Sequence, residues 1–374
     1  MNESSIQDNP YGKHIVDVLG LSLIPGIGEV RFNRLLKHFK RVSDVFNAEV
    51  EVLAEVGRIS RKMAESIKRG YDCAEVQKIL AKLSNAGIKI VTMEDADYPG
   101  KLREIYDPPP VLYFAGDMPS ANAPSVAVIG SRKASSYGKS MTERITAELV
   151  AAGMVIVSGF ARGIDSVAHS TAIENRGKTI AVMGCGLDII YPSENKQLYE
   201  KIIRSGCAIT EFKPGTPPEA GNFPKRNRII SGISAGVVII EAAQKSGALL
   251  TARHALDQGR EVFAVPGPAN SASSEGTNKL IKSGAKMTTS VADILEELRI
   301  QFKTPPISQS EKRKMESLDG DQKLIYQNLD ENGVQIDRLA ALVSVAMPKL
   351  LGLLLEMELS GYVRTLPGKR YARV

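Results

Sequence analysis

The 374-residue sequence predicts an α/β protein with a doubly wound, mostly parallel sheet, a helical domain before it and a winged-helix domain after it. Two observations predict the sheet. Short apolar runs recur between about residues 125 and 300, each the length of one buried strand, and helix-length amphipathic segments separate them. Small or hydrogen-bonding residues follow almost every run. Strands and helices that alternate in this way form a parallel sheet with helices on both faces.

The composition indicates several domains. Hydrophobic residues make up 43% of the chain, enough for more than one core. The net charge of +6 suits a polyanionic partner, although many soluble proteins carry such a charge. Tryptophan is absent and aromatic residues make up only 5%, so any stacking on bases would depend on a few Phe and Tyr side chains.

The cysteines indicate a reducing compartment. Cys73, Cys185 and Cys207 are far apart, odd in number and without a CxxC pair, which argues against a disulfide framework or a zinc site. The polar N-terminal residues do not resemble a signal peptide, and no apolar run reaches the roughly 20 residues of a membrane span. We therefore expect a cytoplasmic protein that makes no contact with a membrane.

Residues 1–87 predict a helical domain. Apolar residues recur at helical spacing on both sides of Pro25-Gly26-Ile27-Gly28, which is the helix-hairpin-helix pattern. The backbone N–H groups of such a turn contact a phosphate in many nucleic-acid-binding proteins. A weaker second copy follows near Leu53–Gly57. A helical packing domain or a protein-docking domain explains the pattern equally well.

Residues 88–300 predict the sheet domain. Prolines between residues 98 and 110 break any helix, and Val111–Phe114 reads as a short strand. Segments such as Lys139–Ala152 and Leu249–Gln258 have the pattern of amphipathic helices. The remaining strands are expected at Val126–Ile129, Met154–Val157, Thr179–Met183, Val237–Ile240 and Glu261–Val265, with a weaker one at Ala208–Ile209.

Residues 301–320 are polar, charged and contain prolines, so they predict a flexible linker. Residues 321–374 then predict three helices and a β-hairpin that turns at Pro367-Gly368, which is the pattern of a winged helix.

The third helix of this winged helix is expected at Pro348–Leu359. It carries one cation, Lys349, against Glu356 and Glu358, so it is poorly suited to read base edges in duplex DNA. The hairpin is basic instead. We expect this domain to contact phosphates through its wing or a protein through its third helix.

The predicted sheet has a candidate binding edge, because ligands of such sheets bind beyond the carboxyl ends of the strands. Small residues there let a ligand approach the backbone, and helix starts supply N–H donors. Several strand ends of this kind along one edge predict a site. They are Gly130-Ser131-Arg132, Ser158–Gly163, Gly184–Gly186, Glu241–Ala243 and Pro266-Gly267.

A cationic stretch completes the predicted edge. Pro224 favours a helix start, and cations after it would lie near a helix N-terminus, where free N–H groups already favour an anion. With Arg132 and Arg162 these cations are too many for one monophosphate, which indicates a backbone of several phosphates. A solvated basic turn is the alternative. The stretch contains Phe223, Lys225, Arg226, Asn227 and Arg228.

Catalytic patterns are missing from the sequence. Neither GxGxxG nor GxxxxGKS/T occurs, so the fingerprints of a dinucleotide site and a nucleoside triphosphatase are not met. Asp165 and Glu241 are the acidic residues on the predicted edge, and we expect them to hold the arginines in position. The protein is therefore predicted not to be an enzyme and to need no cofactor and no metal. The four histidines are His14, His38, His169 and His254, and a structural role is expected for His169 and His254, which lie inside predicted helices.

These motifs resemble the core domain of the DNA-processing protein A family (DprA, also called Smf). The resemblance covers about half of the chain, and members of that family often carry an N-terminal sterile-alpha-motif or helix-hairpin-helix-like domain and a C-terminal winged helix. Phe160 stands where the family more often has an aliphatic residue. The matching stretches are Val126–Arg132, Val157–Asp165, Thr179–Pro192, Phe223–Ser231, Glu241–Thr251 and Arg260–Gly267.

The resemblance implies an extended Rossmann-like domain that binds single-stranded DNA without sequence preference and forms a homodimer. It also implies that the protein protects incoming single-stranded DNA and loads the RecA recombinase onto it during natural transformation. Carried over by motif, the DNA-binding residues are Gly130, Ser131, Arg132, Ser158, Gly159, Arg162, Phe223, Lys225, Arg226, Asn227 and Arg228, supported by Asp165, Glu241, Ser246 and Thr251.

Two alternatives remain at this point. Related Rossmann folds, such as the cytokinin-activating phosphoribohydrolases, hydrolyse the glycosidic bond of a nucleoside monophosphate, and Glu241 would be the candidate acid here. A transcription factor led by the winged helix is weaker, because of the acidic third helix. Phe160, Phe212 and Phe223 are candidate surfaces for base stacking, although packing in the core explains each of them too.

Overall fold

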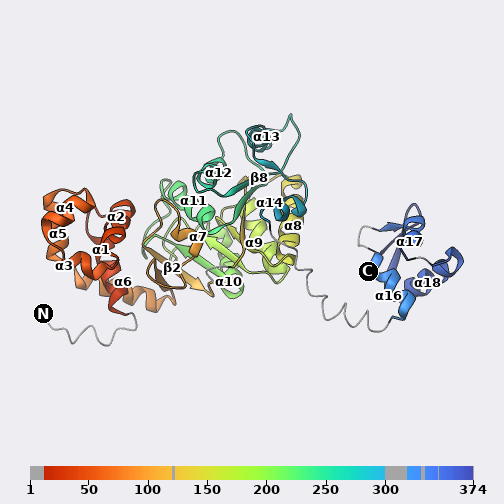
Figure 1. The fold of residues 1–374 in the computed structure, drawn as a ribbon, viewed down its shortest axis with the longest axis horizontal. Helices are drawn as coiled ribbons and strands as arrows, with labels where there is room; N and C mark the ends of the chain where they lie inside the picture. The colour runs from red at the N-terminus through yellow and green to blue at the C-terminus, as the bar shows by residue number, and fades with distance from the viewer. Residues whose placement is uncertain (1–11, 120–122, 300–317, 330–332, 344, 374) are drawn as a thin grey trace. The chain divides into compact units, whose positions relative to one another are not determined.

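The computed structural model describes residues 12–119, 123–299, 318–329, 333–343 and 345–373. Contacts divide the chain into two compact units, with the division between Phe302 and Lys303 (Figure 1). The predicted linker, residues 301–320, lies outside the described residues up to position 317. The predicted domain boundaries stay predictions.

Six helices open the first unit, and they confirm the predicted helical region. The first predicted helix-hairpin-helix consists of α1 and α2 with the turn Pro25–Gly28 between them, and α4 and α5 form the second copy. Gly26 in the first turn has a φ of +87°, a conformation that side-chain-bearing residues rarely adopt. The helices are α1 (Lys13–Leu23), α2 (Glu29–Phe39), α3 (Val42–Asn47), α4 (Val50–Gly57), α5 (Arg61–Arg69) and α6 (Cys73–Asn85).

The nine-stranded sheet has the order β1-β2-β6-β5-β4-β3-β7-β8-β9. From β6 to β9 all neighbours are parallel, whereas β1 pairs with β2, and β2 with β6, antiparallel. This confirms the predicted, mostly parallel sheet, to which the structure adds β1 and β9. The strands are β1 (Lys89–Thr92), β2 (Val111–Gly116), β3 (Ser125–Ile129), β4 (Val155–Ser158), β5 (Thr179–Val182), β6 (Cys207–Thr210), β7 (Gly236–Ile239), β8 (Glu261–Ala264) and β9 (Lys286–Met287).

After the edge strands β1 and β2, the chain enters the interior of the sheet at β3, and its direction across the sheet then reverses once. It runs outward from β3 through β4 and β5 to β6, then returns to β7 on the other side of β3. The carboxyl ends of β3 and β7 therefore flank the switch point, where ligands of doubly wound sheets bind.

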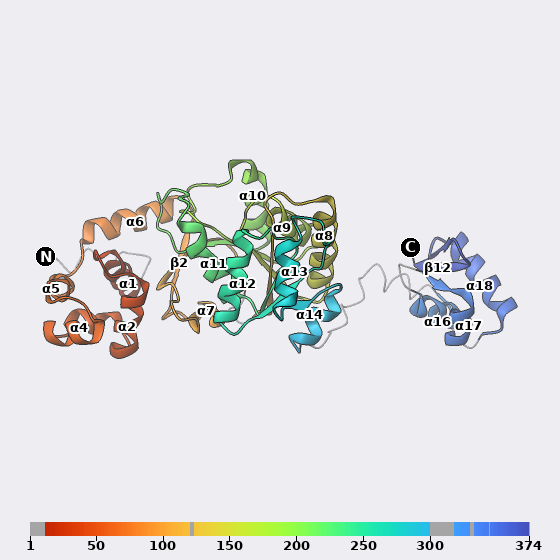
Figure 2. The same cartoon turned by 90° about the horizontal axis from the view of Figure 1, so that it is seen from above.

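Helices cover both faces of the sheet. Figure 2 shows α11, α12 and α13 side by side along one face, with α8, α9 and α10 behind the sheet. The bounds are α7 (Gly100–Arg103), α8 (Ser136–Ala151), α9 (Ile164–Glu174), the 3-10 helix η2 (Ser193–Asn195), α10 (Lys196–Ser205), α11 (Asn222–Ile233), α12 (Gly247–Asp257), α13 (Glu275–Lys282) and α14 (Val291–Glu297).

One hydrophobic cluster joins the N-terminal helices to the sheet. It begins with Val16 of α1, includes Ile90 of β1 and Tyr113 of β2, and extends to Ala208 of β6. The helical region and this edge of the sheet therefore share buried surface within the first unit.

The second unit confirms the predicted winged helix. Its three-stranded sheet has the order β10-β12-β11, and its core contains Ile325, Leu339, Leu350 and Leu354. The elements are α16 (Gly320–Asn328), β10 (Val334–Gln335), α17 (Ile336–Val343), α18 (Met347–Leu359), β11 (Val363–Leu366) and β12 (Arg370–Arg373).

Within the described part of the chain, no single helix is long and apolar enough to cross a membrane. The pair α17 and α18, bent by 107° at its junction, meets that criterion together by length and composition only.

Candidate nucleic-acid interface

A cavity of about 710 Å³ opens at the switch point of the sheet. Its walls are the strand end 130–133, the first turns of α11 and the start of α12. A smaller cavity of about 40 Å³ shares residues with it and adds Gly159 and Arg162. We call the two cavities together the groove. Of the predicted site residues, the larger cavity contains Gly130, Ser131, Arg132, Asp165, Phe223, Arg226, Asn227, Ser246 and Thr251.

Four predicted site residues do not line the groove: Ser158, Lys225, Arg228 and Glu241. Ser158 is fully buried, and its hydroxyl donates a hydrogen bond of 2.7 Å to the carbonyl oxygen of Val128, which ties β4 to β3. Lys225 is exposed on α11, directly before the groove residue Arg226. Ser158 therefore supports the strand ends, while Lys225 stands at the surface beside them.

Helix α11 begins at Asn222, two residues before the start predicted at Pro224. Proline is tolerated there because the first turn of a helix needs no N–H donor. The three cations after Pro224 lie on different sides of the helix, because each successive helical residue is rotated by about 100°. Lys225 is exposed, whereas Arg226 and Arg228 are buried and lie on different sides of the helix.

Arg226 lies buried beneath the groove. Its Nη1 donates to the carbonyl oxygens of Gly159 and Val182. A Cβ atom on Gly159 would lie 2.7 Å from both Arg226 Nη1 and Asp165 Oδ2, so glycine lets the two charged groups approach the same backbone. Burial raises the pKa of Asp165 to about 6, against the opposing charge of Arg226. Burial also lowers the pKa of Arg226 to about 10.

Phe223 forms an aromatic wall of the groove. The guanidinium carbons of Arg132 and Arg226 lie 5.5 Å and 5.9 Å from its ring centroid, within the range of cation–π attraction. The ring of Tyr191 is 5.7 Å away, centroid to centroid. Phe160, by contrast, is only 1% exposed and packs edge-on against Tyr199, so it belongs to the core.

Arg162, at the mouth of the smaller cavity, pairs with Glu194 of η2. Its Nε donates to one carboxylate oxygen and its Nη2 to the other, at 2.9 Å, and both side chains are about half exposed or more. The hydrogen bond from Arg162 holds the pKa of Glu194 below its usual value. The Glu194 carboxylate therefore occupies the guanidinium N–H donors of Arg162 to which a phosphate would otherwise bind.

For the strand binding that the resemblance implies, we expect Glu194→Gln to raise the affinity roughly two- to five-fold, since an exposed ion pair that competes with phosphate is lost. Anisotropy titration of a labelled homopolymer strand measures the effect. Glu65→Gln is the matched control, because Glu65 also pairs with an exposed arginine, Arg61, on α5. Equal affinities of wild type and Glu194→Gln would show that Arg162 does not bind the strand.

The structure gives Glu241 a role other than the expected contact with an arginine. Its carboxylate accepts hydrogen bonds from the N–H of Ser135 at 3.0 Å, from the Ser135 hydroxyl, and from Ser273 at 3.3 Å. A Cβ atom on Gly138 would lie 2.3 Å from it. Glu241, 2% exposed, therefore supports the N-terminus of α8, and this placement disfavours it as the acid of a nucleotide hydrolase.

Other side chains in the groove were missed by sequence reasoning. Lys133, Tyr191, Lys245 and Leu250 line the larger cavity. Lys133 and Lys245 directly adjoin the predicted Arg132 and Ser246, so proximity to a motif was the available signal.

The histidine in α9, His169, has the surroundings of a structural residue. His169 is fully buried, its Nδ1 lies 2.7 Å from Thr179 Oγ1, and burial lowers its pKa to about 3, so the ring is neutral. Among the described residues, no group of three or more His, Cys, Asp and Glu side chains could hold a metal ion.

Known proteins match the chain in all three of its predicted parts. The family model for DNA recombination-mediator protein A matches residues 89–299, that for the DprA winged helix domain residues 309–369, and that for a SAM-like helix-hairpin-helix tandem residues 18–70.

Curated relatives and solved structures agree with these matches. Protein Smf of Synechocystis sp. is 34% identical over 95% of this chain and 98% of its own length. DNA processing protein DprA of Bacillus subtilis is 41% identical over 62% of this chain and 79% of its own.

The X-ray structure of DNA processing protein A from Streptococcus pneumoniae superposes with a TM-score of 0.66, at 35% identity, over 76% of this chain and 96% of that one. A structure that addresses the single-stranded DNA binding mode of the Helicobacter pylori protein gives a TM-score of 0.51, at 33% identity, over 56% of this chain and 96% of that one. The chain belongs to the DNA recombination-mediator protein A family.

Proposed function

We propose that this protein binds single-stranded DNA in the groove, protects it in the cytoplasm, and loads RecA onto it during natural transformation. The observation that supports this proposal most is the groove, because Arg132 and Arg226 flank the ring of Phe223 in a cavity of about 710 Å³. Lys133 and Lys245 add positive charge to its lining. The binding mode studied in the Helicobacter pylori relative supports it.

The aromatic wall favours a single strand over a duplex. A ring inside a cavity can stack only on a base that has left its partner strand, while the surrounding cations follow the phosphates. Such stacking tolerates any base, since every base has a π-face. We therefore propose binding without sequence preference.

A salt series of fluorescence anisotropy with a labelled dT homopolymer tests this proposal. Removing one phosphate contact lowers the slope of log affinity against log salt by about 0.7 for a single strand. We expect this change in Lys225→Ala and in Arg132→Ala, both exposed, and no change in Lys201→Ala, an exposed lysine on α10. Failure of the wild type to bind at low salt would overturn the proposal.

Exposed apolar side chains support a homodimer through the sheet domain. Leu256 on α12 is 62% exposed, and Met287 on the edge strand β9 is 54% exposed. We propose these residues as candidates for the dimer interface, because contiguous apolar patches at a surface mark interaction sites. Sedimentation velocity tests the dimer, and retention of RecA by the immobilised protein loaded with a strand tests the mediator role.

The winged helix is better suited to a protein partner than to base edges. On α18, Lys349 pairs with Asp321 at 2.5 Å, and Glu358 accepts from the Thr365 N–H at 2.9 Å, so both charges serve contacts within the domain. Leu355 and Leu359 on the same helix are 58% and 81% exposed. We propose that α18 contacts a protein, and that any DNA contact is made by the basic wing.

A further inference from the structure

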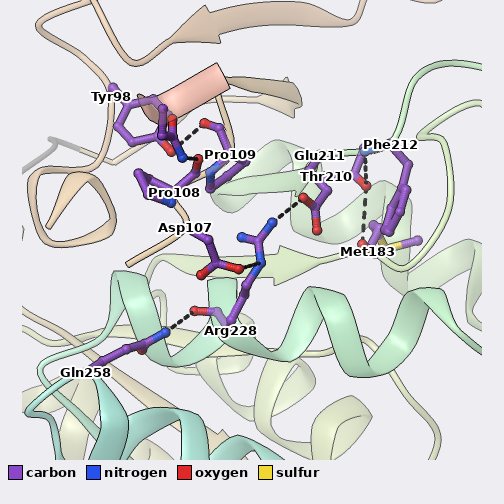
Figure 3. A network of polar contacts seen from close by, with 11 residues as sticks. Tyr98, Asp107, Pro108, Pro109, Met183, Thr210, Glu211, Phe212, Arg228 and Gln258 are labelled. Carbon is purple, nitrogen blue, oxygen red and sulfur yellow. Dashed lines mark hydrogen bonds and ion pairs between the residues drawn. The ribbon is translucent and has the colours of Figure 1, made fainter. Parts of the chain in front are cut away.

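A buried ion-pair network holds the underside of the groove helix α11. The Arg228 side chain, 7% exposed, pairs through Nε with Asp107 Oδ2 at 3.2 Å and through Nη2 with Glu211 Oε2 at 2.5 Å (Figure 3). Gln258, directly after α12, donates to the Arg228 carbonyl oxygen at 3.0 Å. Arg228 therefore connects α11 to the end of β6, to α12 and to the segment before β2.

The same segment touches the N-terminal helical region. Asp107 directly precedes three prolines, and Asn33 of α2 donates through Nδ2 to the carbonyl oxygen of Pro108 at 2.8 Å. Tyr98 donates through its hydroxyl to the carbonyl oxygen of Pro109, also at 2.8 Å (Figure 3). Because proline fixes φ, residues 108–110 form a stiff link between these contacts.

Arg228 does not line the groove, although it is two residues from Arg226, which does. Its cation is buried with two carboxylates, so the side chain satisfies a local charge balance rather than offering charge to a ligand. Burial raises the pKa of Glu211 to about 7, and the charge of Arg228 opposes this shift. Glu211 can therefore take up a proton if its partner is removed.

On the basis of the proposed function, we propose that Arg228 is a positioning residue. It fixes α11 in the orientation that brings Arg226 and Asn227 into the groove, and through Asp107 and Pro108 it couples DNA binding to the N-terminal helical region. Coupling of this kind is reciprocal: a bound strand must stabilise the contact with α2 as much as that contact favours the strand.

Asp107→Asn tests the proposal in the full chain, because Asp107 is 35% exposed and its loss leaves Arg228 paired with Glu211. We expect affinity for a dT homopolymer to fall roughly two- to five-fold, with an unchanged salt slope. Asp117→Asn is the matched control, since Asp117 makes an exposed ion pair with Lys178 elsewhere. Wild-type affinity in folded Asp107→Asn would overturn the proposal.

The double variant Arg228→Met with Glu211→Gln tests Arg228 directly. Because the second substitution removes the Glu211 charge, no unpaired buried carboxylate is left behind. A lower affinity at an unchanged salt slope supports a positioning role, whereas a slope lower by about 0.7 would show a direct phosphate contact and overturn it. Hydrogen exchange adds a readout for the coupling: strand binding should slow exchange in α2 of the wild type but not of the double variant. Equal protection in both would contradict the coupling. If the wild type binds no strand, the proposed function fails instead.

Discussion

Replacing Arg226 with methionine is expected to lower the free energy of unfolding by about 3–5 kcal/mol, because the buried Asp165 carboxylate loses the nearby positive charge that offsets its burial. The change also removes the donor to the carbonyl oxygens of Gly159 and Val182, two strand ends beside the groove. We therefore expect DNA binding to be lost together with stability.

Urea denaturation followed by circular dichroism measures the loss. Lys225→Met is the control on the same helix: its exposed side chain should change stability by no more than about 0.5 kcal/mol, while DNA affinity falls. Adding Asp165→Asn to Arg226→Met should restore part of the stability. Lower pH should also reduce the loss of stability in Arg226→Met. The pKa of Asp165 is raised to about 6, and a protonated carboxyl needs no positive charge beside it. An unchanged urea midpoint would show that the Arg226 charge does not stabilise the buried Asp165 carboxylate.

Gly163→Ala is expected to destabilise the protein by about 2–4 kcal/mol. The alanine would have to adopt a positive φ, and its Cβ atom would collide with neighbouring backbone atoms. Gly163 has a φ of +77°, and a Cβ atom there would lie 2.3 Å from the carbonyl oxygen of Ser131 and 2.7 Å from that of Arg132. The Ser131 carbonyl also accepts from the N–H of Ile164 at 3.1 Å. The substitution must displace the strand end after β3, so we expect DNA affinity to fall by tenfold or more, about 1.4 kcal/mol.

Gly153→Ala provides a reference for a glycine of positive φ without a collision. Gly153 has a φ of +80°, but nothing lies within 4 Å of an added Cβ atom, so only the backbone strain of about 1–2 kcal/mol remains. Thermal or urea denaturation of both variants gives a difference that contains the collision at residue 163 and the strain of its ψ of −126°. If the two substitutions lower the free energy of unfolding by the same amount, the close approach of Gly163 to the Ser131 carbonyl is not rigid.

The sequence was sufficient to predict the sheet because its central strands are short, mostly apolar runs. The edge strands escaped prediction for the opposite reason: β9 has only two residues, one of them a lysine, and its pairing depends on the neighbouring β8. β1 begins with an exposed lysine and pairs with a strand in the chain's proline-containing segment. Tertiary pairing, rather than local pattern, created both.

Side-chain direction was the part of the candidate site that sequence could not supply. A turn of about 100° per residue separates Arg226 from Arg228 on any helix, but only the crossover from β6 to β7 decides which of them faces the groove. Glu241 follows a strand as expected, yet its carboxylate turns towards Ser135 rather than towards an arginine. The residue types and their order predicted which residues lie near the site, whereas tertiary packing determines what each side chain contacts.

The hydrophobic cluster that runs from Val16 to Ala208 has a consequence for how the chain gains and loses its structure. Helices and strands that share one core melt cooperatively, whereas the winged helix, with a core of its own, can melt alone. A removed N-terminal segment would leave Tyr113 and Ile90 facing water, which favours aggregation. Three regions distinguishable by sequence would then behave as two foldons, and the helix-hairpin-helix region would not be a detachable module.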